Sequence, residues 1–301
     1  MIYRPWSDHD RNHGHLASHF AFIKQKHYDM ALIQRYRDDQ GCPQGQSSMN
    51  IHFSASEHDE AKCRLKQLTD RYGQTDLPNA THIVALGGDG HMLHVLQDTM
   101  SYSLPVFGLN CGRLGFLMNL YNDNADLVER LQAAEVAPLH PLRMTATDRD
   151  NAVHTNLAIN EVSILRQTHN AAHVGIMIDH KRQMDCLVCD GVLVATPAGS
   201  TAYNLSAHGP VVPLGGGLLA LTPISPFRPR RWRGALLSDA SKVKLDILEA
   251  EFRPVSASAD SAEVRNVKTV QIEQASEITL HLLYDPGFSL SDRAIREQFL
   301  S

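Results

Sequence analysis

The sequence predicts an α/β nucleotide-binding domain with a parallel, Rossmann-like sheet, followed by an all-β sandwich domain. Three observations lead to this prediction. Apolar strands alternate with helical segments over residues 49–140, which is typical of parallel strand–helix–strand units. Short runs of alternating apolar and polar residues replace that pattern over residues 141–284. Two glycine-rich loops each follow a strand of the first part, where open α/β sheets bind ligands.

The N-terminal segment, residues 1–48, lacks a pattern of strands and helices. Residues 40–48 have the Gly, Pro, Gln and Ser content of a loop. We therefore expect either a poorly ordered N-terminal extension or an upstream reading of the start codon, with Met49 as the working initiator. The alternative is an amphipathic helix over residues 16–37 that packs on the first domain.

The elements of the first domain follow from hydrophobic periodicity. Short apolar runs predict buried strands, and apolar residues at spacings of three and four predict helices. These patterns place strands over residues 50–55, 81–86 and 105–110, and helices over residues 57–72, from Gly90 onward, and near 125–135. A C-terminal helix within residues 285–301, capped by Ser291, is expected to complete this domain.

The second domain is predicted from short strands with turn residues between them. Asp, Asn, Gly and Pro separate the runs, which favours a sandwich of antiparallel sheets. The clearest runs cover residues 162–165, 173–178, 192–195, 243–247 and 278–283.

Composition and charge limit the possible partners. The 301 residues carry a net charge of −5, which gives no general attraction to nucleic acid or to an anionic membrane. No apolar run reaches the roughly 18 residues of a membrane span, and five cysteines do not form a disulfide framework. We expect a cytoplasmic protein that binds no nucleic acid and no membrane, although residues 228–233 form one basic patch.

The first glycine-rich turn combines features that suit phosphate with one that does not. Gly87, Gly88 and Gly90 follow a buried strand and begin a helix, so backbone N–H groups are available to an anion. Asp89 would repel a phosphate unless it binds a metal ion or accepts a proton from an attacking hydroxyl. The turn therefore suggests phosphoryl transfer. The alternative is an ordinary strand-to-helix connection with Asp89 as N-cap.

The second glycine-rich loop, which includes Asn110, Gly112 and Gly115, does not have the glycine spacing of a dinucleotide fingerprint. This disfavours a dehydrogenase. Further along, Asn160 and Glu161 lie between two β runs, where an amide and a carboxylate can bind ribose hydroxyls or an adenine edge. The pair alone is also compatible with a simple turn.

A longer segment, residues 190–206, places a carboxylate before a buried strand, then a Pro-Gly turn, then several hydroxyls. Such a segment can supply backbone N–H groups and hydroxyls to phosphate, and the ring of Tyr203 to a base. In a purely structural interpretation, Ser200 or Thr201 caps a helix and Tyr203 serves packing.

In this order, the motifs resemble those of NAD kinases of the bacterial type. The Gly-Gly-Asp-Gly turn is shared with diacylglycerol, sphingosine and phosphofructo-kinases, whereas the later motifs are specific to NAD kinases. The resemblance covers the chain from Met49 onward. It implies a homodimer or homotetramer that transfers the ATP γ-phosphoryl group to the 2′-hydroxyl of the adenosine ribose of NAD, with Mg²⁺ or another divalent cation bound to the ATP.

The resemblance also implies roles for individual residues. Asp89 matches the catalytic proton acceptor, and Gly87, Gly88 and Gly90 form the phosphate loop, without a metal site of the protein's own. His94, in the first turns of the helix, is expected to contact a phosphate of the ligand. The expected NAD contacts are Asp89, Gly90, His94, Asn160, Glu161, Asp190, Ala198, Thr201, Ala202, Tyr203, Asn204, Leu205 and Ser206.

Two rival functions share part of this pattern. A lipid or sphingoid kinase would have the first glycine-rich turn, but it would also need an exposed apolar groove or a membrane-binding helix. A non-catalytic NAD(P) sensor would keep the pocket and lose Asp89, which is present.

Overall fold

A mixed five-stranded sheet forms the first part of the molecule in the computed structural model, which describes residues 49–112 and 115–287. The order of the strands is β1-β2-β3-β17-β4. Neighbouring strands run parallel from β1 to β17, and β4 is antiparallel to β17. The bounds are β1 (Ile51–Ala55), β2 (His82–Gly87), β3 (Val106–Asn110), β4 (Glu135–Leu139) and β17 (Leu280–Tyr284).

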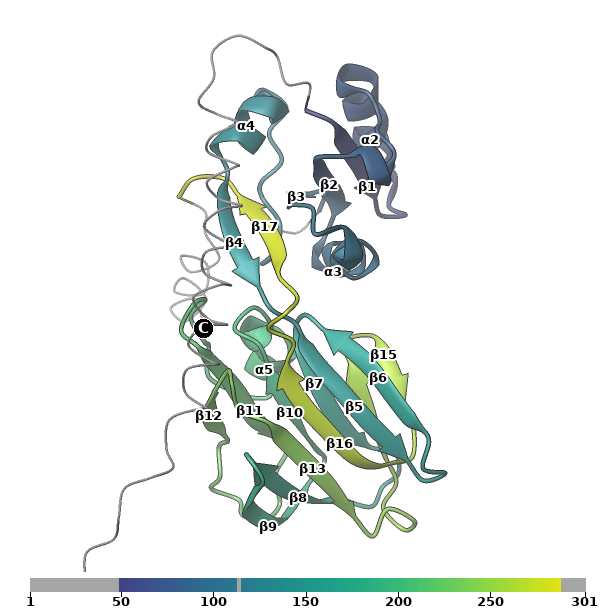
Figure 1. Cartoon of the computed structure of the whole chain (residues 1–301), viewed down its shortest axis with the longest axis vertical. Coiled ribbons are helices and arrows are strands. Elements are labelled where there is room, and N and C mark those ends of the chain that lie inside the picture. Colours follow the sequence, from purple (N-terminus) through teal and green to yellow (C-terminus); the bar gives the residue numbers. More distant parts are fainter. Residues whose placement is uncertain (1–48, 113–114, 288–301) are drawn as a thin grey trace, which may run out of the picture. The chain divides into compact units, whose positions relative to one another are not determined.

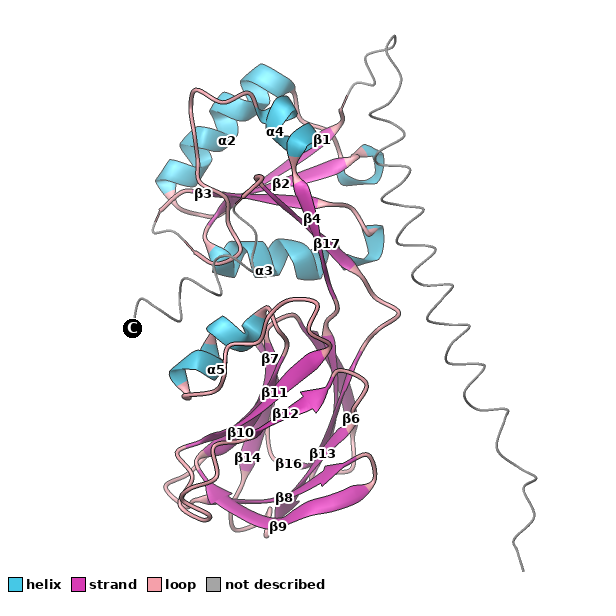
Figure 2. Cartoon of the chain, turned by 90° about the vertical axis from the view of Figure 1, so that its left-hand side faces the viewer, coloured by secondary structure: helices cyan, strands magenta, loops and turns pink. Residues whose placement is uncertain are grey.

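Helices cover both faces of this sheet (Figure 2). On one face, α2 (Asp59–Tyr72) and α4 (Leu127–Ala133) share an apolar cluster with Val84 and Leu86 of β2. On the other face, α3 (Asp89–Asp98) packs with the alternate residues Ile83 and Ala85. The run over β2 is therefore apolar throughout because both of its faces are buried.

The strands and helices predicted within residues 49–135 are confirmed, and β4 is a further strand that we did not predict. The assignment of the last strand is wrong. We expected residues 278–283 to form a strand of the β domain. Instead, β17 lies between β3 and β4 in the first sheet. A short apolar strand has the same local pattern in either domain, so only the pairing with distant strands decides where it lies. The sheet is also mixed rather than purely parallel, because β4 reverses direction.

The second part consists of two antiparallel six-stranded sheets (Figure 1). One has the order β12-β11-β10-β7-β14-β15 and the other the order β6-β5-β16-β13-β8-β9. The bounds of the first are β12 (Ala235–Ser238), β11 (Leu218–Ile224), β10 (Gly191–Ala195), β7 (Glu161–Arg166), β14 (Val255–Ala259) and β15 (Ala262–Val264). Those of the second are β6 (Val153–Ala158), β5 (Leu142–Asp148), β16 (Val267–Gln274), β13 (Val243–Leu248), β8 (Ala172–Ile178) and β9 (Lys181–Cys189).

Alternate residues of both sheets point inward and form one core. Val162 and Ile164 of β7 contribute to it from one sheet, and Val174 and Leu245 contribute from the other. This two-sided core confirms the predicted sandwich. Three short 3₁₀ helices, η1 (Leu77–Asn79), η2 (Met100–Tyr102) and η3 (Gly199–Thr201), and the short helix α5 (Tyr203–Ser206) complete the described elements.

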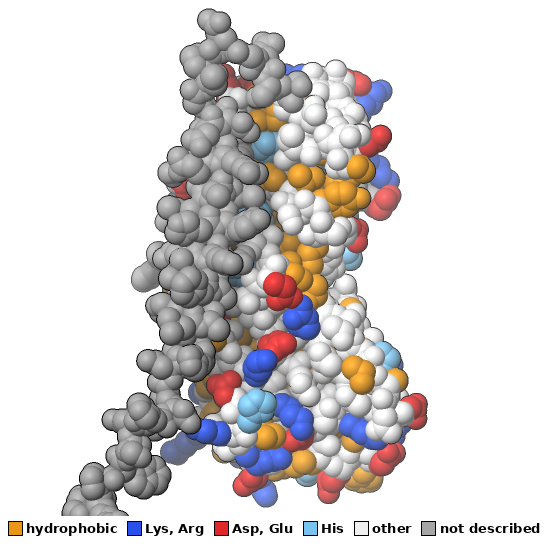
Figure 3. Space-filling view, viewed as in Figure 1, with side chains coloured by type: hydrophobic (Ala, Val, Ile, Leu, Met, Phe, Trp, Pro, Cys, Tyr) orange, Lys and Arg blue, Asp and Glu red, His pale blue; other side chains and the backbone are white. Residues whose placement is uncertain are grey.

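Charged side chains of both signs are interspersed over the strands β5, β16 and β13 (Figure 3). Ion pairs account for this mixture: Lys242 pairs with Glu273 at 2.8 Å, and Lys244 pairs with Asp246 at 2.9 Å. This face therefore carries no large field of a single sign.

Two predicted helices, over residues 16–37 and within residues 285–301, lie outside the described residues. Within the described residues, none of the helices is long and apolar enough to cross a membrane.

The buried side chain of Asn119 joins β17 to the rest of the first sheet. Its Nδ2 donates to the carbonyl oxygen of Leu283 at 3.0 Å, and its Oδ1 accepts from the backbone N–H of Asp285 at 3.1 Å. The backbone of Asn119 also bonds to Gly108 and Asn110 of β3. One side chain thus holds the last strand beside β3.

We predict that Asn119→Ala lowers the free energy of unfolding by about 2–3 kcal/mol, because it leaves backbone groups at Leu283 and Asp285 without partners. Asn124→Ala, in an exposed loop nearby, is the matched control and should change stability by less than about 0.5 kcal/mol. Urea denaturation of both variants measures the difference. Equal stabilities would contradict the role of Asn119.

Candidate active site

The first glycine-rich turn lies at the carboxyl end of β2, where α3 begins. Gly88 is the N-cap of α3 and Asp89 is its first residue. A Cβ at Gly88 or Gly90 would meet no atom of the described residues within 4 Å, so among these residues nothing covers the backbone there. In contrast, a Cβ at Gly87 would lie 3.1 Å from the Ser56 side chain. An open turn at a helix N-terminus is suited to phosphate.

The carboxylate of Asp89 does not cap its own helix. Its Oδ2 accepts from the backbone N–H of Phe116 at 2.7 Å, and its Oδ1 accepts from that of Leu117 at 2.9 Å. The interpretation of Asp89 as an N-cap is therefore wrong. A Cβ at Gly115 would overlap this carboxylate, so Gly115 permits the close approach. Asp89 thereby joins the two glycine-rich loops.

Polar side chains surround this junction. His91 Nε2 lies 3.2 Å from Ser54 Oγ, and burial lowers the pKa of His91. His94 is exposed on α3. Asn110 Nδ2 donates to the carbonyl oxygen of Gly112 at 2.7 Å, whereas its buried Oδ1 has no hydrogen-bond partner among the described residues. An unpaired buried acceptor is costly and indicates a place for a donor on a ligand.

The Asn160–Glu161 turn is held by a residue that sequence reasoning missed, Asp260. Asp260 Oδ1 accepts from the backbone N–H groups of Asn160 at 3.0 Å and Glu161 at 3.2 Å. Its Oδ2 accepts from the N–H of Ile159 at 2.7 Å and from Gln97 Nε2 at 3.0 Å. One carboxylate therefore receives four donors and fixes three consecutive residues of the turn.

The other side of this turn contacts the Pro-Gly segment. Thr196 Oγ1 donates to the carbonyl oxygen of Ile159 at 2.7 Å and accepts from the N–H of Gly199 at 3.0 Å. The N–H of Thr196 donates to the carbonyl oxygen of Asn160 at 2.9 Å. Because a Cβ at Gly199 would overlap Asn160, the two segments approach each other closely. Hydrogen bonds within the protein thus hold the turn from both sides.

Glu161 combines burial with an unpaired acceptor. Its Oε2 is buried and has no hydrogen-bond partner among the described residues. Burial, together with the nearby charge of Asp260, raises the pKa of Glu161 to about 7. The side chain points away from the sandwich core, since Val162 and Ile164 point inward. It lies opposite Ala195 on the face that α5 covers.

The structure divides the residues expected around the 3₁₀ helix and α5 into two groups. Asn204 is structural: its Nδ2 donates to the carbonyl oxygens of Ser200 and Pro210, and its Oδ1 accepts from Thr222 Oγ1 at 2.6 Å. Its amide has no capacity exposed to a ligand. The partly exposed residues Thr201, Ala202, Tyr203 and Leu205 and the exposed Ser206 remain available, and Ala198 is buried.

Asp190 lies at the opposite end of β10 from Ala195, the residue that pairs with Glu161. Asp190 Oδ1 is 2.6 Å from Arg166 Nε. Ala195 follows Asp190 by five residues along β10, which corresponds to roughly 16 Å. Because Glu161 lies opposite Ala195, a similar distance separates Asp190 from Glu161. Burial raises the pKa of Tyr203, and the charges of Glu161 and Asp190 both add to this shift. Both carboxylates therefore act electrostatically on the Tyr203 hydroxyl.

One apolar cluster brings the motifs of the two sheets together. Met92, Val95 and Leu96 of α3 share it with Ile159 and Ala198. The helix that begins at Asp89 therefore packs on the turn before Asn160 and on the Pro-Gly segment. Gln97 of the same helix bonds to Asp260, as described above. The helix that follows the phosphate loop and the segments that precede Asn160 and contain Ala198 therefore share one apolar cluster.

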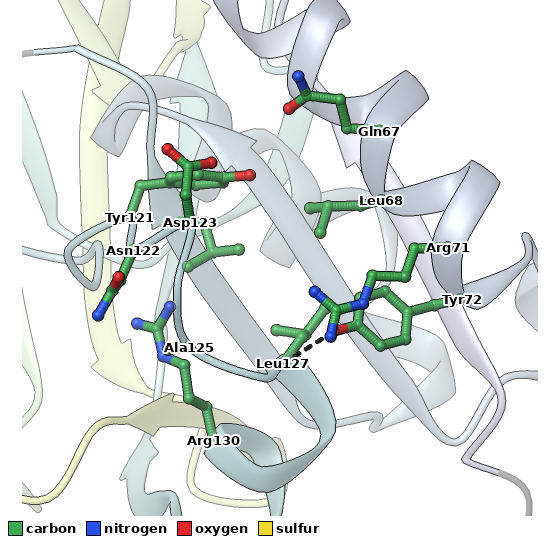
Figure 4. Close-up of a pocket in the computed structure, with 11 residues that line it drawn as sticks. Gln67, Leu68, Arg71, Tyr72, Tyr121, Asn122, Asp123, Ala125, Leu127 and Arg130 are labelled. Atoms are coloured by element: carbon green, nitrogen blue, oxygen red, sulfur yellow. Dashed lines mark hydrogen bonds between the residues drawn. The ribbon is translucent and has the colours of Figure 1, made fainter.

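A separate cavity of about 130 Å³ lies between α2 and α4 (Figure 4). Arg71 and Arg130 line it, but Arg71 pairs with Asp126 at 2.9 Å and Arg130 pairs with Asp285 at 2.6 Å. None of the residues expected to bind a ligand lines this cavity. It is therefore not the candidate site.

Asp260, Gln97 and Thr196 are the residues that motif reasoning did not single out. Asp260 has positive φ in the tight loop that connects β14 and β15, a position where Asp is common for conformational reasons alone. Gln97 is one polar residue on an amphipathic helix. Neither has a local signal of its role, whereas Thr196 lies within a motif that was already recognised.

An α/β sheet with an open glycine-rich turn and an adjacent carboxylate, packed on a β-sandwich with paired amide and carboxylate groups, defines a nucleotide-dependent kinase. Family comparison agrees in both parts. The ATP-NAD kinase N-terminal domain matches residues 33–134, and the ATP-NAD kinase C-terminal domain matches residues 159–279. The chain belongs to the NAD kinase family.

Relatives support the same family over nearly their full lengths. The chain is 53% identical over 251 residues to the NAD kinase of Hyphomonas neptunium, covering 83% of this chain and 98% of that protein. It is 53% identical over 249 residues to the NAD kinase of Caulobacter vibrioides, covering 83% and 95%.

Two solved structures share the fold. An NAD kinase from Archaeoglobus fulgidus in complex with ATP superimposes with a TM-score of 0.64 at 26% identity, covering 83% of this chain and 97% of that one. The yeast NADH kinase complexed with NADH has a TM-score of 0.69 at 20% identity, covering 83% and 87%.

We predict that Glu161 makes the free energy of unfolding fall as pH rises. Its pKa is about 7 in the folded state, against 4.5 ordinarily. The unfolded chain therefore loses this proton first between pH 4.5 and 7, and stability decreases over that range. Glu161→Gln should remove this decrease and raise stability above pH 8 by up to about 3 kcal/mol.

Denaturation at pH 5 and pH 8 measures the effect, with Glu135→Gln as the exposed control. Burial also raises the pKa of Asp260. The Glu161→Gln variant should therefore still lose some stability between pH 5 and pH 8, but less than the unaltered protein. A variant that follows the same pH dependence as the unaltered protein would contradict the assignment.

Proposed function

We propose that this protein phosphorylates NAD to NADP by transferring the γ-phosphoryl group of ATP to the 2′-hydroxyl of the adenosine ribose. The observation that carries the proposal is the single apolar cluster that joins α3, which begins at Asp89, to the segments that contain Asn160 and Ala198. It brings a phosphate-binding helix terminus and the groups suited to a ribose into one unit. Membership of the NAD kinase family supports the substrate pair.

In this proposal Asp89 accepts the proton of the attacking hydroxyl. Each carboxylate oxygen of Asp89 accepts one backbone N–H and keeps further acceptor capacity for a hydroxyl. As the ribose oxygen bonds to the γ-phosphorus, the bond to the leaving ADP oxygen breaks and the hydroxyl proton moves to Asp89. The two backbone bonds hold the carboxylate in place, which reduces the entropic cost of reaching that geometry.

Asn160 and Glu161 are proposed to bind the NAD. The unpaired Oε2 of Glu161 can accept from a ribose hydroxyl, and the hydrogen-bonded turn positions the side-chain amide of Asn160. Tyr203 offers a partly exposed ring to a base. The remaining NAD contacts proposed are Gly90, His94, Ala198, Thr201, Ala202, Leu205 and Ser206, and Asp190 at the far end of β10.

The triphosphate of ATP is proposed to lie at the open turn of Gly87, Gly88 and Gly90, with the N-terminus of α3. Among residues 49–112 and 115–287, no group of three or more His, Cys, Asp and Glu side chains has the arrangement of a metal site. We therefore propose that Mg²⁺ or another divalent cation arrives with the ATP and is held mainly by phosphate oxygens. Such a cation would neutralise negative charge on the triphosphate.

The rival functions are a lipid or sphingoid kinase, a non-catalytic sensor and nucleic-acid binding at the basic patch. A lipid or sphingoid kinase is not favoured, because the relatives described above are NAD kinases over nearly their full lengths. A non-catalytic sensor would require that Asp89 serves only to join the two glycine-rich loops. In the basic patch, Trp232 is partly buried against the sandwich core.

Assembly and location stay proposals. We propose a homodimer or homotetramer, supported by the exposed apolar side chains Phe227 and Leu236 around the β11–β12 connection. Light scattering on the purified protein would test this. We propose the cytoplasm as the location, supported by the four described cysteines, which are all free thiols.

The direct test of function is a coupled assay for NADP formation from NAD, ATP and Mg²⁺ with the purified protein. Formation of NADP that requires all three components supports the proposal. Tight binding of NAD without turnover would favour the sensor instead.

We predict that Asp89→Asn lowers kcat by roughly 10² to 10⁴-fold, the usual scale for loss of a general base. KM for NAD should change much less, since Asn160 and Glu161 are unaltered. The amide also opposes one of the two backbone N–H donors, so a moderate loss of stability is expected. A variant with near-normal kcat would remove Asp89 from the chemistry, whatever its stability.

We predict that Gly115→Ala impairs catalysis without touching either substrate. The added Cβ would overlap the Asp89 carboxylate and displace it, which should lower kcat by at least roughly tenfold. Gly112→Ala in the same loop is the matched control, because a Cβ there meets no atom within 4 Å. Equal rates in the two variants would show that the position of Asp89 does not limit the reaction.

A further inference from the structure

Two carboxylates hold the two ends of α3. At the N-terminus, Asp89 bonds to the second glycine-rich loop. Near the C-terminus, Gln97 bonds to Asp260 of the β14–β15 loop at 3.0 Å. Eight residues separate Asp89 and Gln97, which is about 12 Å along the helix axis. The bond at Gln97 joins this helix to the β-sandwich in addition to the apolar cluster.

Both carboxylate oxygens and the backbone N–H of Asp260 take part in hydrogen bonds. Its carboxylate accepts from Gln97 and from the N–H groups of residues 159–161, and its own N–H donates to the carbonyl oxygen of Glu161 at 3.1 Å. The hairpin loop therefore forms hydrogen bonds with both the backbone N–H and the carbonyl oxygen of Glu161. Since Gln97 shares Oδ2 with Ile159, movement of α3 and movement of the turn are coupled through one oxygen atom.

We propose that Asp260 is a positioning residue, and that its hydrogen bond to Gln97 keeps α3 in register with the Asn160–Glu161 turn. This proposal rests on the proposed function in one respect only, namely that Asp89 and Glu161 act on the same substrate. Neither Asp260 nor Gln97 contacts the reacting atoms. They act by fixing the separation between the proton acceptor and the ribose-binding groups.

The hydrogen bond between Gln97 and Asp260 has a fixed donor and a fixed acceptor, so it can be tested by exchanging the amide and the carboxylate between the two positions. The carboxylate at 260 accepts and the amide at 97 donates. Gln97→Glu places two carboxylates against each other and should break the link. Adding Asp260→Asn restores a donor and an acceptor, now reversed, although the N–H of Ile159 loses its partner. The double variant should therefore be less impaired than the sum of the two single variants.

The first measurement needs no catalysis. Backbone amide hydrogen exchange of residues 159–161 should be roughly tenfold faster in Gln97→Leu than in the unaltered protein, as expected for loss of one hydrogen bond. Asp98→Asn, at the next and exposed position of α3, is the matched control and should leave this exchange unchanged. Unchanged exchange in Gln97→Leu would overturn the proposal even if the protein is an active kinase.

The second measurement is kinetic. Gln97→Leu should raise KM for NAD several-fold, whereas KM for ATP should change little. Gln97→Glu should be worse, and Gln97→Glu with Asp260→Asn should recover part of the loss. Additive effects in this cycle would overturn the proposed coupling. If the Asp260→Asn single variant does not fold, the two Gln97 variants decide the question by themselves.

The third measurement separates positioning from general stability. Among the described residues, the charge that raises the pKa of Glu161 is that of Asp260 in the β14–β15 loop, and Glu161 in turn raises the pKa of Tyr203 in α5. In a plot of kcat/KM against pH, ionisation of Glu161 should produce one inflection. Removing the charge of Asp260 should move this inflection to lower pH. A merely structural loss would lower the whole profile without moving it. Absence of kinase activity in the unaltered protein would refute the proposed function but leave the exchange result valid.

Discussion

The backbone of the partly buried Ile159–Glu161 turn needs hydrogen-bond partners, and this constraint links several elements of the molecule. The partners are one carboxylate, Asp260, on one side and one hydroxyl, Thr196, on the other. Because Asp260 also binds Gln97, the same solution fixes the position of α3. The hydrogen-bonded turn then presents Glu161 with an acceptor that the described residues leave unpaired.

In the proposed function, both carboxylates central to the site have a structural and a chemical role. Asp89 joins the two glycine-rich loops, and the bonds that do so would also hold it for the proposed proton transfer. The buried Glu161, proposed to bind a hydroxyl, has a raised pKa, which we expect to reduce stability at neutral pH. Functional sites commonly carry such a cost because a ligand, rather than the protein, is meant to complete the hydrogen bonding.

Several candidate site residues could be predicted from sequence because their signals are local. The turn from Gly87 to Gly90 follows a short apolar strand, and Asn160–Glu161 lies between β runs. The roles of Asn204 and Asp190 could not be predicted in this way. Asn204 turned out to hold the segment around Pro210, and Asp190 lies at the other end of β10 from Glu161. Motif membership alone does not state which atoms of a side chain remain available.

The sequence by itself determined the class of fold, the order of most elements and the family, because each depends on short-range periodicity or on ordered motifs. Only the tertiary structure decided that β17 belongs to the first sheet, where it pairs with β3 and is held by Asn119. Only it revealed Asp260 and Gln97 as partners, 163 residues apart in the chain. Contacts at such separations depend on which surfaces are buried together, and no local pattern records that choice.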